Sequence, residues 1–171
     1  MPRFLDPQPL DSEHRVNGFD CGVGSLDIWL VQHARAAAGA GSARTYVVLD
    51  SEQDRVVGYH ALSLASIEHS EATERASSGM PKHPIPAMLL ARLAVDRAVQ
   101  GKGIGAFLLR DAMSRALSVA EQAGMRLLLV HALNDEARAF YEHFGFEASP
   151  TDAMNLQLLV KDIRLALDNQ G

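Results

Sequence analysis

The sequence predicts a mixed α/β domain, and three features carry the prediction. An early stretch with helical periodicity is followed by two strand-like runs separated by a short polar turn, an order typical of an antiparallel hairpin. A strand, a glycine-rich turn and an amphipathic stretch then follow one another directly. A second strand–helix pair and a final strand complete the order, so we expect a mixed central sheet flanked by helices.

Each element rests on its own local pattern. Helical periodicity marks residues 25–38, residues 105–122 and a short helix that begins at Asn134 or Asp135, runs through Phe144 and is ended by Gly145. β-branched and apolar runs mark strands at residues 44–49, 56–64, 88–95, 126–132 and 155–165, of which the last turns helical near its end. The stretch 71–86 contains three prolines, so we expect a long loop of the kind that often carries function.

Length and composition favour a single domain over residues 1–171 with a full hydrophobic core. The chain is 47% hydrophobic and 22% charged, which is typical of globular proteins. No apolar run approaches the ~20 residues that span a bilayer. The first residues lack an apolar segment and contain an acid and two prolines, so we expect no signal peptide, no membrane association and a cytoplasmic protein.

Cys21 is the only cysteine, which excludes an intramolecular disulfide and suits a reducing compartment. A catalytic thiol is one reading of it. We favour a small half-buried thiol, because no histidine follows in a Cys/His signature. We expect no metal site.

The charge is distributed unevenly along the chain. The net charge of −5 argues weakly against a nucleic-acid partner. Between residues 75 and 115, however, seven basic residues face only two acids, Asp96 and Asp111. The basic residues are Arg75, Lys82, Arg92, Arg97, Lys102, Arg110 and Arg115. This local excess of positive charge favours a phosphate-rich ligand.

The segment from Leu93 to Gly105 is the most informative in the chain. An apolar strand breaks into Gln100-Gly101-Lys102-Gly103-Ile104-Gly105, and this turn opens directly into a helix. Backbone N–H groups at a helix N-terminus lack intrahelical acceptors, and glycine lets the backbone come close to an anion. We therefore expect a phosphorylated cofactor at this turn.

Two sequence blocks together resemble the GNAT N-acetyltransferase superfamily. Residues 100–105 fit its (Gln/Arg)-x-x-Gly-x-(Gly/Ala) signature after a strand. About thirty residues later, residues 134–146 resemble its Asn-x-x-Ala-x-x-Phe-Tyr-x-x-x-Gly-Phe block. A single glycine pattern is weak, but two blocks in this order and spacing are specific.

This resemblance implies the GNAT acyltransferase fold and acetyl-coenzyme A as cosubstrate. It places the diphosphate on the amides of residues 101–105, the pantetheine on backbone groups of Leu93 and Val95, and Asn134 in contact with the cofactor. The expected cofactor-binding residues are Leu93, Ala94, Val95, Gln100, Gly101, Lys102, Gly103, Ile104, Gly105, Asn134, Ala137 and Phe140.

Tyr141 is the expected catalytic residue. The resemblance places it near the thioester sulfur, where a phenol can donate a proton or hydrogen bond to the departing thiolate. A backbone N–H near Val95 can stabilise the oxyanion. Without the motif, an aromatic ring packed on the sheet would be the simpler reading of Tyr141.

A narrower resemblance points to the acetyltransferase toxins of TacT type, found in bacterial toxin–antitoxin pairs. Residues 19–22, 26–30, 43–48 and 92–96 carry it, and it extends to Ser149-Pro150. It implies acetylation of the α-amine of aminoacyl-tRNA, arrested translation, a cognate antitoxin and a homodimer. An α-amine titrates near ~7.7–8, so a strong general base is not required. Glu68 and His69 are the candidates for a proton relay, with two solvated loop residues as the alternative.

Binding tRNA requires cations for phosphate. The candidates are Arg35, Arg44, Arg75, Lys82, Arg92 and Arg97. Arg92 is the preferred one, because a charge inside an apolar strand should face a cleft or a partner.

Two alternatives stay open. The enzyme could acetylate a small amine, an antibiotic or a protein N-terminus, although such enzymes usually line the acceptor cleft with acids. A module that binds acetyl-CoA or a partner without turnover would not need an intact Tyr141.

Overall fold

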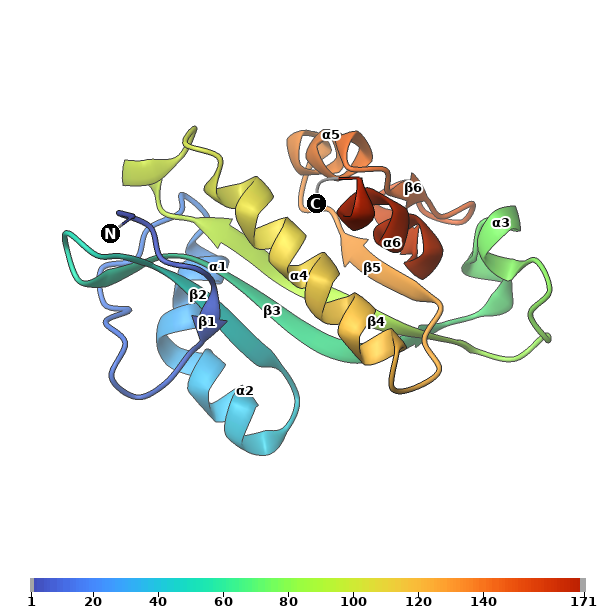
Figure 1. Cartoon of the computed structure of the whole chain (residues 1–171), viewed down its shortest axis with the longest axis horizontal. Coiled ribbons are helices and arrows are strands. Elements are labelled where there is room, and N and C mark those ends of the chain that lie inside the picture. The colour runs from blue at the N-terminus through green and yellow to red at the C-terminus, as the bar shows by residue number, and fades with distance from the viewer. Residues whose placement is uncertain (1, 170–171) are drawn as a thin grey trace. The chain divides into compact units, whose positions relative to one another are not determined.

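The computed structural model describes residues 2–169. Seven strands are hydrogen-bonded in the order β1-β2-β3-β4-β5-β7-β6, with helices flanking them, which confirms the predicted mixed α/β class (Figure 1). The chain divides into two compact units. The first comprises the residues up to Ser63 together with Ala91–Ala112, and the second comprises Leu64–Leu90 and the residues from Met113 onward.

The first unit is built on an antiparallel hairpin. Its elements are β1 (Gln8–Pro9), α1 (Gly24–Ile28), the π-helical turn η1 (Trp29–His33), α2 (Ala34–Ala40), β2 (Arg44–Asp50), most of β3 (Arg55–Ile67), the end of β4 (Ile85–Val95), the 3-10 turn η3 (Arg97–Val99) and the first half of α4 (Ile104–Ala120). β2 pairs with β3 from Arg44↔Leu62 to Asp50↔Arg55, and β1 adds to the outer edge of β2. The predicted hairpin is therefore confirmed.

Two apolar clusters cover the two faces of the strands in this unit. One packs Phe19, Leu30 and Ala34 against Val47 and Tyr59. The other packs the first turns of α4 against Val48, Val57 and Val99. Figure 1 shows α4 crossing in front of the strands and the blue α1–α2 segment behind them.

Gly58 allows α4 to lie close to β3. A Cβ at this position would stand 3.0 Å from Leu108 Cδ1 and 3.2 Å from Ile104 Cγ2. Both side chains are buried, so they have little freedom to move away. The absence of a side chain on Gly58 thus fixes where the N-terminus of α4 meets the sheet.

The single helix predicted for residues 25–38 is divided by a π-helical turn. The π-turn occupies Trp29–His33, between α1 and α2. α2 ends at Gly41, which adopts the left-handed conformation (φ 75°) as a helix C-cap. Leu26, Leu30 and Ala34 still follow i, i+4 spacing across this turn and pack in one cluster, so the periodicity does not reveal the π-turn.

The second unit holds the rest of the sheet. Its elements are the 3-10 turn η2 (His69–Glu71), α3 (Glu74–Ser77), β5 (Leu127–His131), α5 (Asp135–His143), β6 (Glu147–Ala148), β7 (Asn155–Leu159) and α6 (Val160–Asp168), with the ends of β3, β4 and α4 that fall in this unit. β4 pairs with β5 in parallel from Ala87↔Leu127 to Leu90↔Val130. β7 pairs antiparallel with both β5 and β6.

Part of the predicted loop at 71–86 is ordered by the second unit. The buried Gln157 side chain accepts from Thr73 N (2.9 Å) and donates to the Glu71 carbonyl (3.0 Å). Arg126 donates to the carbonyls of Arg75, Ala76 and Ser78 at the C-terminus of α3. Side chains distant in sequence therefore supply these hydrogen bonds, and local propensity does not predict them.

The strand predicted for residues 155–165 is too long. It ends at Leu159, and α6 begins at Val160, whose N–H donates to the Arg126 carbonyl (3.1 Å). The helical end that the sequence suggested is a full helix. The unpredicted β1, η3 and β6 have only two or three residues each, which is too short for a periodicity to register.

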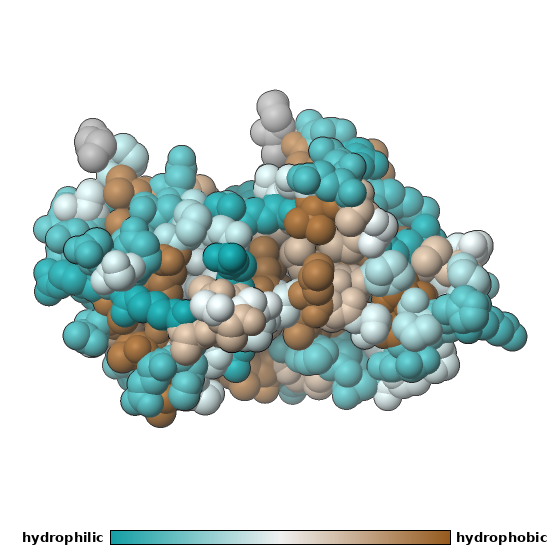
Figure 2. Space-filling view, turned by 90° about the horizontal axis from the view of Figure 1, so that it is seen from below, coloured by the Kyte–Doolittle hydropathy of each residue, from teal (hydrophilic) through white to brown (hydrophobic). Residues whose placement is uncertain are grey.

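Large apolar side chains at the surface are few. In the first unit Ile28 is 50% exposed and Val31 is 36% exposed, both on the α1–η1 segment. Figure 2 shows brown apolar groups separated by teal polar ones on one face. Among residues 2–169, no helix is both long enough and apolar enough to cross a membrane.

Asp96 joins four parts of the first unit where β4 ends. Its carboxylate accepts from Arg55 Nη1 (3.0 Å), Asp20 N (3.1 Å) and Ala98 N (2.9 Å). Its own N–H donates to the Val57 carbonyl (2.8 Å). Burial alone would raise the pKa of Asp96, but the hydrogen bonds from Arg55 and the two amides outweigh it and lower the pKa below its ordinary value.

Replacing this carboxylate tests that clamp. A group whose pKa is lower in the folded state stabilises the fold above its unfolded pKa of ~3.9, and this contribution disappears as the pH falls through the folded value. We expect Asp96→Ala to lower the free energy of unfolding by about 3 kcal/mol at pH 7, since Arg55 and two amides lose their acceptor. Urea titrations should show the difference from the wild type shrinking below pH ~4.

Asp168→Ala serves as the control, because Asp168 is exposed at the end of α6. It should change stability by less than about 0.5 kcal/mol. A difference between Asp96→Ala and the wild type that is equally large at pH 3 and pH 7 would contradict the assigned role.

Candidate acetyl-CoA site

The glycine turn between η3 and α4 requires two left-handed residues. Gly101 has φ 81° and Gly103 has φ 83°, a conformation that residues with a Cβ adopt only with strain. Neither position is crowded, since nothing lies within 4 Å of a Cβ built there. Backbone conformation, and not space, therefore explains these two glycines.

The turn presents a row of free amides. α4 begins at Ile104, and Phe107 N donates to the Gly103 carbonyl (3.1 Å). Within the described part of the chain, no protein acceptor binds the backbone N–H groups of residues 101–106. Gly101, Lys102 and Gly103 are exposed, and Ile104 anchors the first turn in the core. Open amides at the positive end of a helix bind phosphate.

Gln100 fixes the start of this turn. Its side-chain amide donates to the Val95 carbonyl (2.8 Å) and to the Cys21 carbonyl (3.1 Å). The residue predicted as a cofactor contact therefore links the end of β4 to the N-terminal segment. Its amide nitrogen is already occupied, so it supports the turn from within the protein.

The end of β4 has one edge bonded to β3 and one edge available. Because Asp96 N donates to Val57 on β3, the alternation of a strand turns the backbone groups of Leu93 and Val95 to the opposite edge. The registered pairing with β5 ends at Leu90. Ala94 is buried and directs its backbone groups to β3. Leu93 and Val95 thus have the orientation that backbone pairing with an extended ligand requires.

In the second unit, Asn134 is the N-cap of α5. Its Oδ1 accepts from Ala137 N at 2.8 Å, and its backbone is extended. The predicted helix start is therefore confirmed, and Asn134 and Ala137 are joined by the cap. Phe140 is half-buried one turn further on and packs edge-on against Tyr141, with ring centroids 5.2 Å apart.

Tyr141 is buried within an aromatic cluster of the second unit. Its ring also meets Phe146 edge-on at 5.6 Å. Burial raises the pKa of Tyr141 to about 12, so the phenol stays protonated throughout the physiological range. The phenol oxygen makes no hydrogen bond to another residue of the range 2–169, which leaves its proton available to a ligand.

Cys21 is a half-buried thiol, as the sequence suggested. Burial, followed by the contact with Asp27, raises the pKa of Cys21 to about 11. A thiol with this pKa is protonated and a poor nucleophile. No group of three or more metal-ligating side chains occurs among the described residues.

Glu68 and His69 lie in the second unit, where Glu68 and Glu71 form a reciprocal capping box around η2. Glu68 therefore has a structural role in this turn.

The six cations predicted to bind tRNA have different surroundings. Arg75 forms ion pairs with Glu147 (2.7 Å) and Asp162 (3.0 Å), which raise its pKa. Arg97 pairs with Asp20 at 3.1 Å, and Arg35 donates to the carbonyls of Asp11 and His14.

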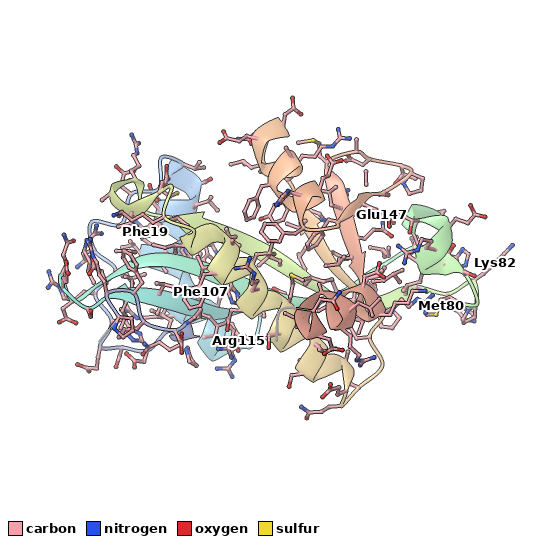
Figure 3. The ribbon with its side chains drawn as sticks, turned by 45° about the horizontal axis from the view of Figure 1, so that its top comes forward. Phe19, Met80, Lys82, Phe107, Arg115 and Glu147 are labelled. Carbon is pink, nitrogen blue, oxygen red and sulfur yellow. The ribbon has the colours of Figure 1, made fainter. Side chains whose placement is uncertain are left out.

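The other three cations have no such partner among residues 2–169. Arg44 is exposed, and Lys82 points outward from the loop after α3 (Figure 3). Arg92 lies over the ring of Trp29, with Cζ 4.3 Å from the centroid.

Two features were missed at the sequence level. Trp29 falls in the helical stretch predicted for residues 25–38, and that pattern does not show that its ring lies under Arg92. His60 on β3 is fully buried and lies 2.7 Å from Asp111 on α4. Polar residues at buried positions of a strand and of a helix were the available signal for this pair.

Comparison with known proteins identifies the family. Residues 41–148 match the model of the acetyltransferase (GNAT) domain. The chain is 46% identical to the tRNA-acetylating toxin of Mycobacterium tuberculosis strain ATCC 25618 / H37Rv over 164 residues, which cover 96% of this chain and 97% of that protein.

Two solved structures extend this relation. AtaT complexed with acetyl-methionyl-tRNAfMet is similar with a TM-score of 0.88 at 28% identity, over 96% of this chain and 99% of that one. A tyrosine-to-phenylalanine mutant of the AtaT toxin, bound to the C-terminus of the antitoxin AtaR and to acetyl-CoA, has a TM-score of 0.83 at 28% identity, over 97% and 99%.

The open helix N-terminus, the capped aromatic helix and these matches define an acetyl-CoA-dependent N-acetyltransferase. The chain belongs to the GNAT acetyltransferase family, in the branch of the tRNA-acetylating toxins.

The contribution of the Asn134 cap to stability can be measured separately from any contact of Asn134 with the cofactor. Asn134→Ala should lower the free energy of unfolding by about 1 kcal/mol, since the Ala137 N–H loses its acceptor. Asn134→Ser should restore most of that loss, because serine caps equally well. Thermal denaturation measures both variants.

Calorimetric titration with acetyl-CoA separates the two roles of Asn134. If both variants bind acetyl-CoA with wild-type affinity, Asn134 is a cap alone. A weaker affinity in the stable Asn134→Ser variant would assign it a direct contact with the cofactor.

Proposed function

We propose that this protein transfers the acetyl group of acetyl-CoA to the α-amine of aminoacyl-tRNA and so blocks peptide-bond formation. The observation that carries the proposal is the row of open amides at residues 101–106, presented by the glycine turn at the N-terminus of α4. The acceptor is supported by the relative named a tRNA-acetylating toxin and by the AtaT complex with acetyl-methionyl-tRNA.

The donor would be held by the backbone of the first unit. Amides 101–105 would take the diphosphate, with the exposed Lys102 adding charge. The N–H and C=O of Leu93 and the N–H of Val95 would pair with the pantetheine. The Val95 carbonyl already accepts from Gln100, so it is not free for this pairing. Ala94, Ile104 and Gly105 would shape this surface. The family motif adds Asn134, Ala137 and Phe140 to the residues that would bind the cofactor.

Tyr141 would assist the departure of the coenzyme A thiolate. Full transfer of a proton from a phenol of pKa about 12 to a thiolate of ordinary pKa ~8.5 is uphill. A hydrogen bond from the phenol to the developing thiolate is favourable at once, and it strengthens in a site that excludes water. We therefore assign Tyr141 to hydrogen-bond donation to the developing thiolate during C–S cleavage, and solvent protonates the thiolate after it departs.

The acceptor amine needs little activation. An α-amine with a pKa near ~7.7–8 is substantially unprotonated at neutral pH. Water can take the remaining proton once the amine has attacked the thioester carbonyl. This chemistry requires neither a nucleophilic residue nor a buried general base.

The partners follow from the same reading. Phosphates of tRNA would be contacted directly by Arg44, Lys82 and Arg92. The already bonded Arg35, Arg75 and Arg97 would have to share their guanidinium groups between their protein partners and a phosphate.

AtaT binds the C-terminus of its antitoxin, and we propose a cognate antitoxin for this chain. We also propose a homodimer that acts in the cytoplasm, where charged tRNA is used.

The reaction is tested with total charged tRNA and labelled acetyl-CoA. Mass spectrometry of the aminoacyl ends should show acetyl groups on the α-amine of one or more amino acids. Labelling of a small amine in place of every aminoacyl end would overturn the assignment of the acceptor.

Tyr141→Phe tests the catalytic assignment. The variant should fold, bind acetyl-CoA with near wild-type affinity and lose about 10²-fold to 10³-fold in kcat, since only the hydroxyl is removed. Single-turnover acetylation of charged tRNA measures the loss.

Phe140→Leu is the matched control for packing in the same aromatic cluster. It should affect stability more than kcat. Wild-type turnover by Tyr141→Phe would remove Tyr141 from the mechanism.

Gly101→Ala and Gly103→Ala test the diphosphate turn. Each places a Cβ on a residue with positive φ, at a cost of about 1–2 kcal/mol, and the turn should relax away from its amide-presenting shape. We expect the Kd for acetyl-CoA, measured by calorimetry, to rise about tenfold or more.

Gly39→Ala is the matched glycine control. Gly39 lies in α2 with nothing within 4 Å of a Cβ built there. The substitution should stabilise the protein by up to about 1 kcal/mol and leave the affinity unchanged. Unchanged affinity in both turn variants would refute the proposed diphosphate site.

A further inference from the structure

The end of β4 carries different side chains on its two faces. Leu93 and Val95 pack with the first turns of α4. Ala94 packs with Phe19 and Leu30 on the side of α1, η1 and α2. Because side chains alternate along a strand, Arg92 shares the face of Ala94. Arg92 therefore lies on the opposite side of β4 from the helix whose N-terminus presents the free amides.

Trp29 is held rigidly on that face. Its ring stacks on Tyr59, with centroids 6.0 Å apart and planes 14° apart. Tyr59 is fully buried, donates its phenol hydrogen to the Leu26 carbonyl (2.7 Å) and makes a T-shaped contact with Phe19 at 5.6 Å. Trp29 also opens the π-turn η1, a distortion found frequently at functional sites. The indole thus has a fixed position and a fixed orientation.

Arg92 rests on this fixed ring. Its guanidinium carbon lies 4.3 Å from the ring centroid, within the range of a cation–π contact. Arg3, Arg55 and Arg75 are each paired with a carboxylate. Among residues 2–169, no carboxylate pairs with Arg92, so Trp29 orients the guanidinium while its N–H donors stay available for an anion.

A guanidinium held over an aromatic ring is oriented before it binds phosphate. Its planar fork matches two phosphate oxygens, and orientation by the ring reduces the entropy lost on binding. Its outer face can also stack on a base. A cation without this support would lose most of its rotamer freedom when it binds.

We propose that Arg92, oriented by Trp29, binds a phosphodiester at the 3′ acceptor end of tRNA. Trp29 is the positioning residue, and it acts through Arg92. The inference rests on the proposed function for the identity of the acceptor. A diphosphate bound at the N-terminus of α4 occupies one side of β4. The other side, where α1, η1 and α2 pack, is then left for the acceptor. Arg92 is three residues before Val95, roughly 10 Å along the strand.

Four variants test the pair: Arg92→Gln, Trp29→Leu, Trp29→Phe and the double variant Arg92→Gln/Trp29→Leu. The kinetic readouts are the KM and kcat for aminoacyl-tRNA and the KM for acetyl-CoA. The binding readout is the salt dependence of affinity for total deacylated tRNA and for a short single-stranded RNA ending in CCA, both followed by fluorescence anisotropy. The binding measurements do not depend on catalysis.

We expect Arg92→Gln to raise the KM for aminoacyl-tRNA about tenfold, with the KM for acetyl-CoA unchanged. The slope of log affinity against log salt should flatten by about 0.7, the value for one phosphate contact on a single strand. Trp29→Leu should change both quantities in the same direction, and Trp29→Phe should recover part of the loss. The double variant should be no weaker than Arg92→Gln alone, because Trp29 acts through Arg92.

Arg164→Gln is the matched control, since Arg164 is an exposed arginine on α6 with no assigned role. It should leave the salt slope unchanged. An unchanged KM and slope in Arg92→Gln would overturn the proposal, as would additive losses in the double variant. The proposal would also be overturned if Arg92→Gln lost binding to an antitoxin peptide but kept wild-type binding to RNA. If Trp29→Leu does not fold, Trp29→Phe and Arg92→Gln still decide the question.

These outcomes separate the two proposals. If the wild type acetylates no aminoacyl-tRNA yet binds the CCA-ended RNA with a slope that depends on Arg92, the proposed reaction fails and the phosphate contact stands. If the wild type acetylates aminoacyl-tRNA and Arg92→Gln does so equally well, the reaction stands and this inference fails.

Discussion

The buried carboxylate of Asp96 is the contact on which the geometry of the first unit depends. It accepts from Arg55 on β3, from the amide of Asp20 in the N-terminal segment and from the amide of Ala98 in η3. Three separate segments are therefore fixed to the residue where β4 ends. The glycine turn begins only four residues later, and Gln100 adds a second link between Val95 and Cys21. The turn can present open amides because the bonds that support it are made by the side chains of Asp96 and Gln100, and none of them uses the amides of residues 101–106.

This arrangement explains what the sequence predicts and what it does not. The glycine turn, the strand before it and the helix after it are local features, and spacing and turn chemistry predict them correctly. The cap at Asn134 was found in the same way. Side-chain roles that depend on distant partners were missed. Gln100 fits the family signature as a cofactor contact, but the sequence does not show that its amide nitrogen also binds two protein carbonyls. Trp29 has the spacing of a core residue, and only the course of β4 brings Arg92 over it.

The same reasoning explains the errors in secondary structure. Thr73 and Glu71 are ordered by Gln157, more than eighty residues away, so no local pattern marks this part of the loop. The change from β7 to α6 occurs at Val160, a β-branched residue that favours the strand by propensity. Its N–H is taken by Arg126, which is again remote in sequence. Tertiary hydrogen bonds decide both places.

The arginines show how a protein of net negative charge can still present cations to RNA. Net charge counts every arginine equally, but Arg3, Arg55, Arg75 and Arg97 are bound to carboxylates. A paired guanidinium must give up a partner, or share it, before it binds phosphate. Arg92 has a neutral aromatic ring in place of that partner, so its charge is not cancelled and its orientation is still fixed. The pairing state of each cation therefore decides where an anionic chain can bind, and the overall balance of charges does not.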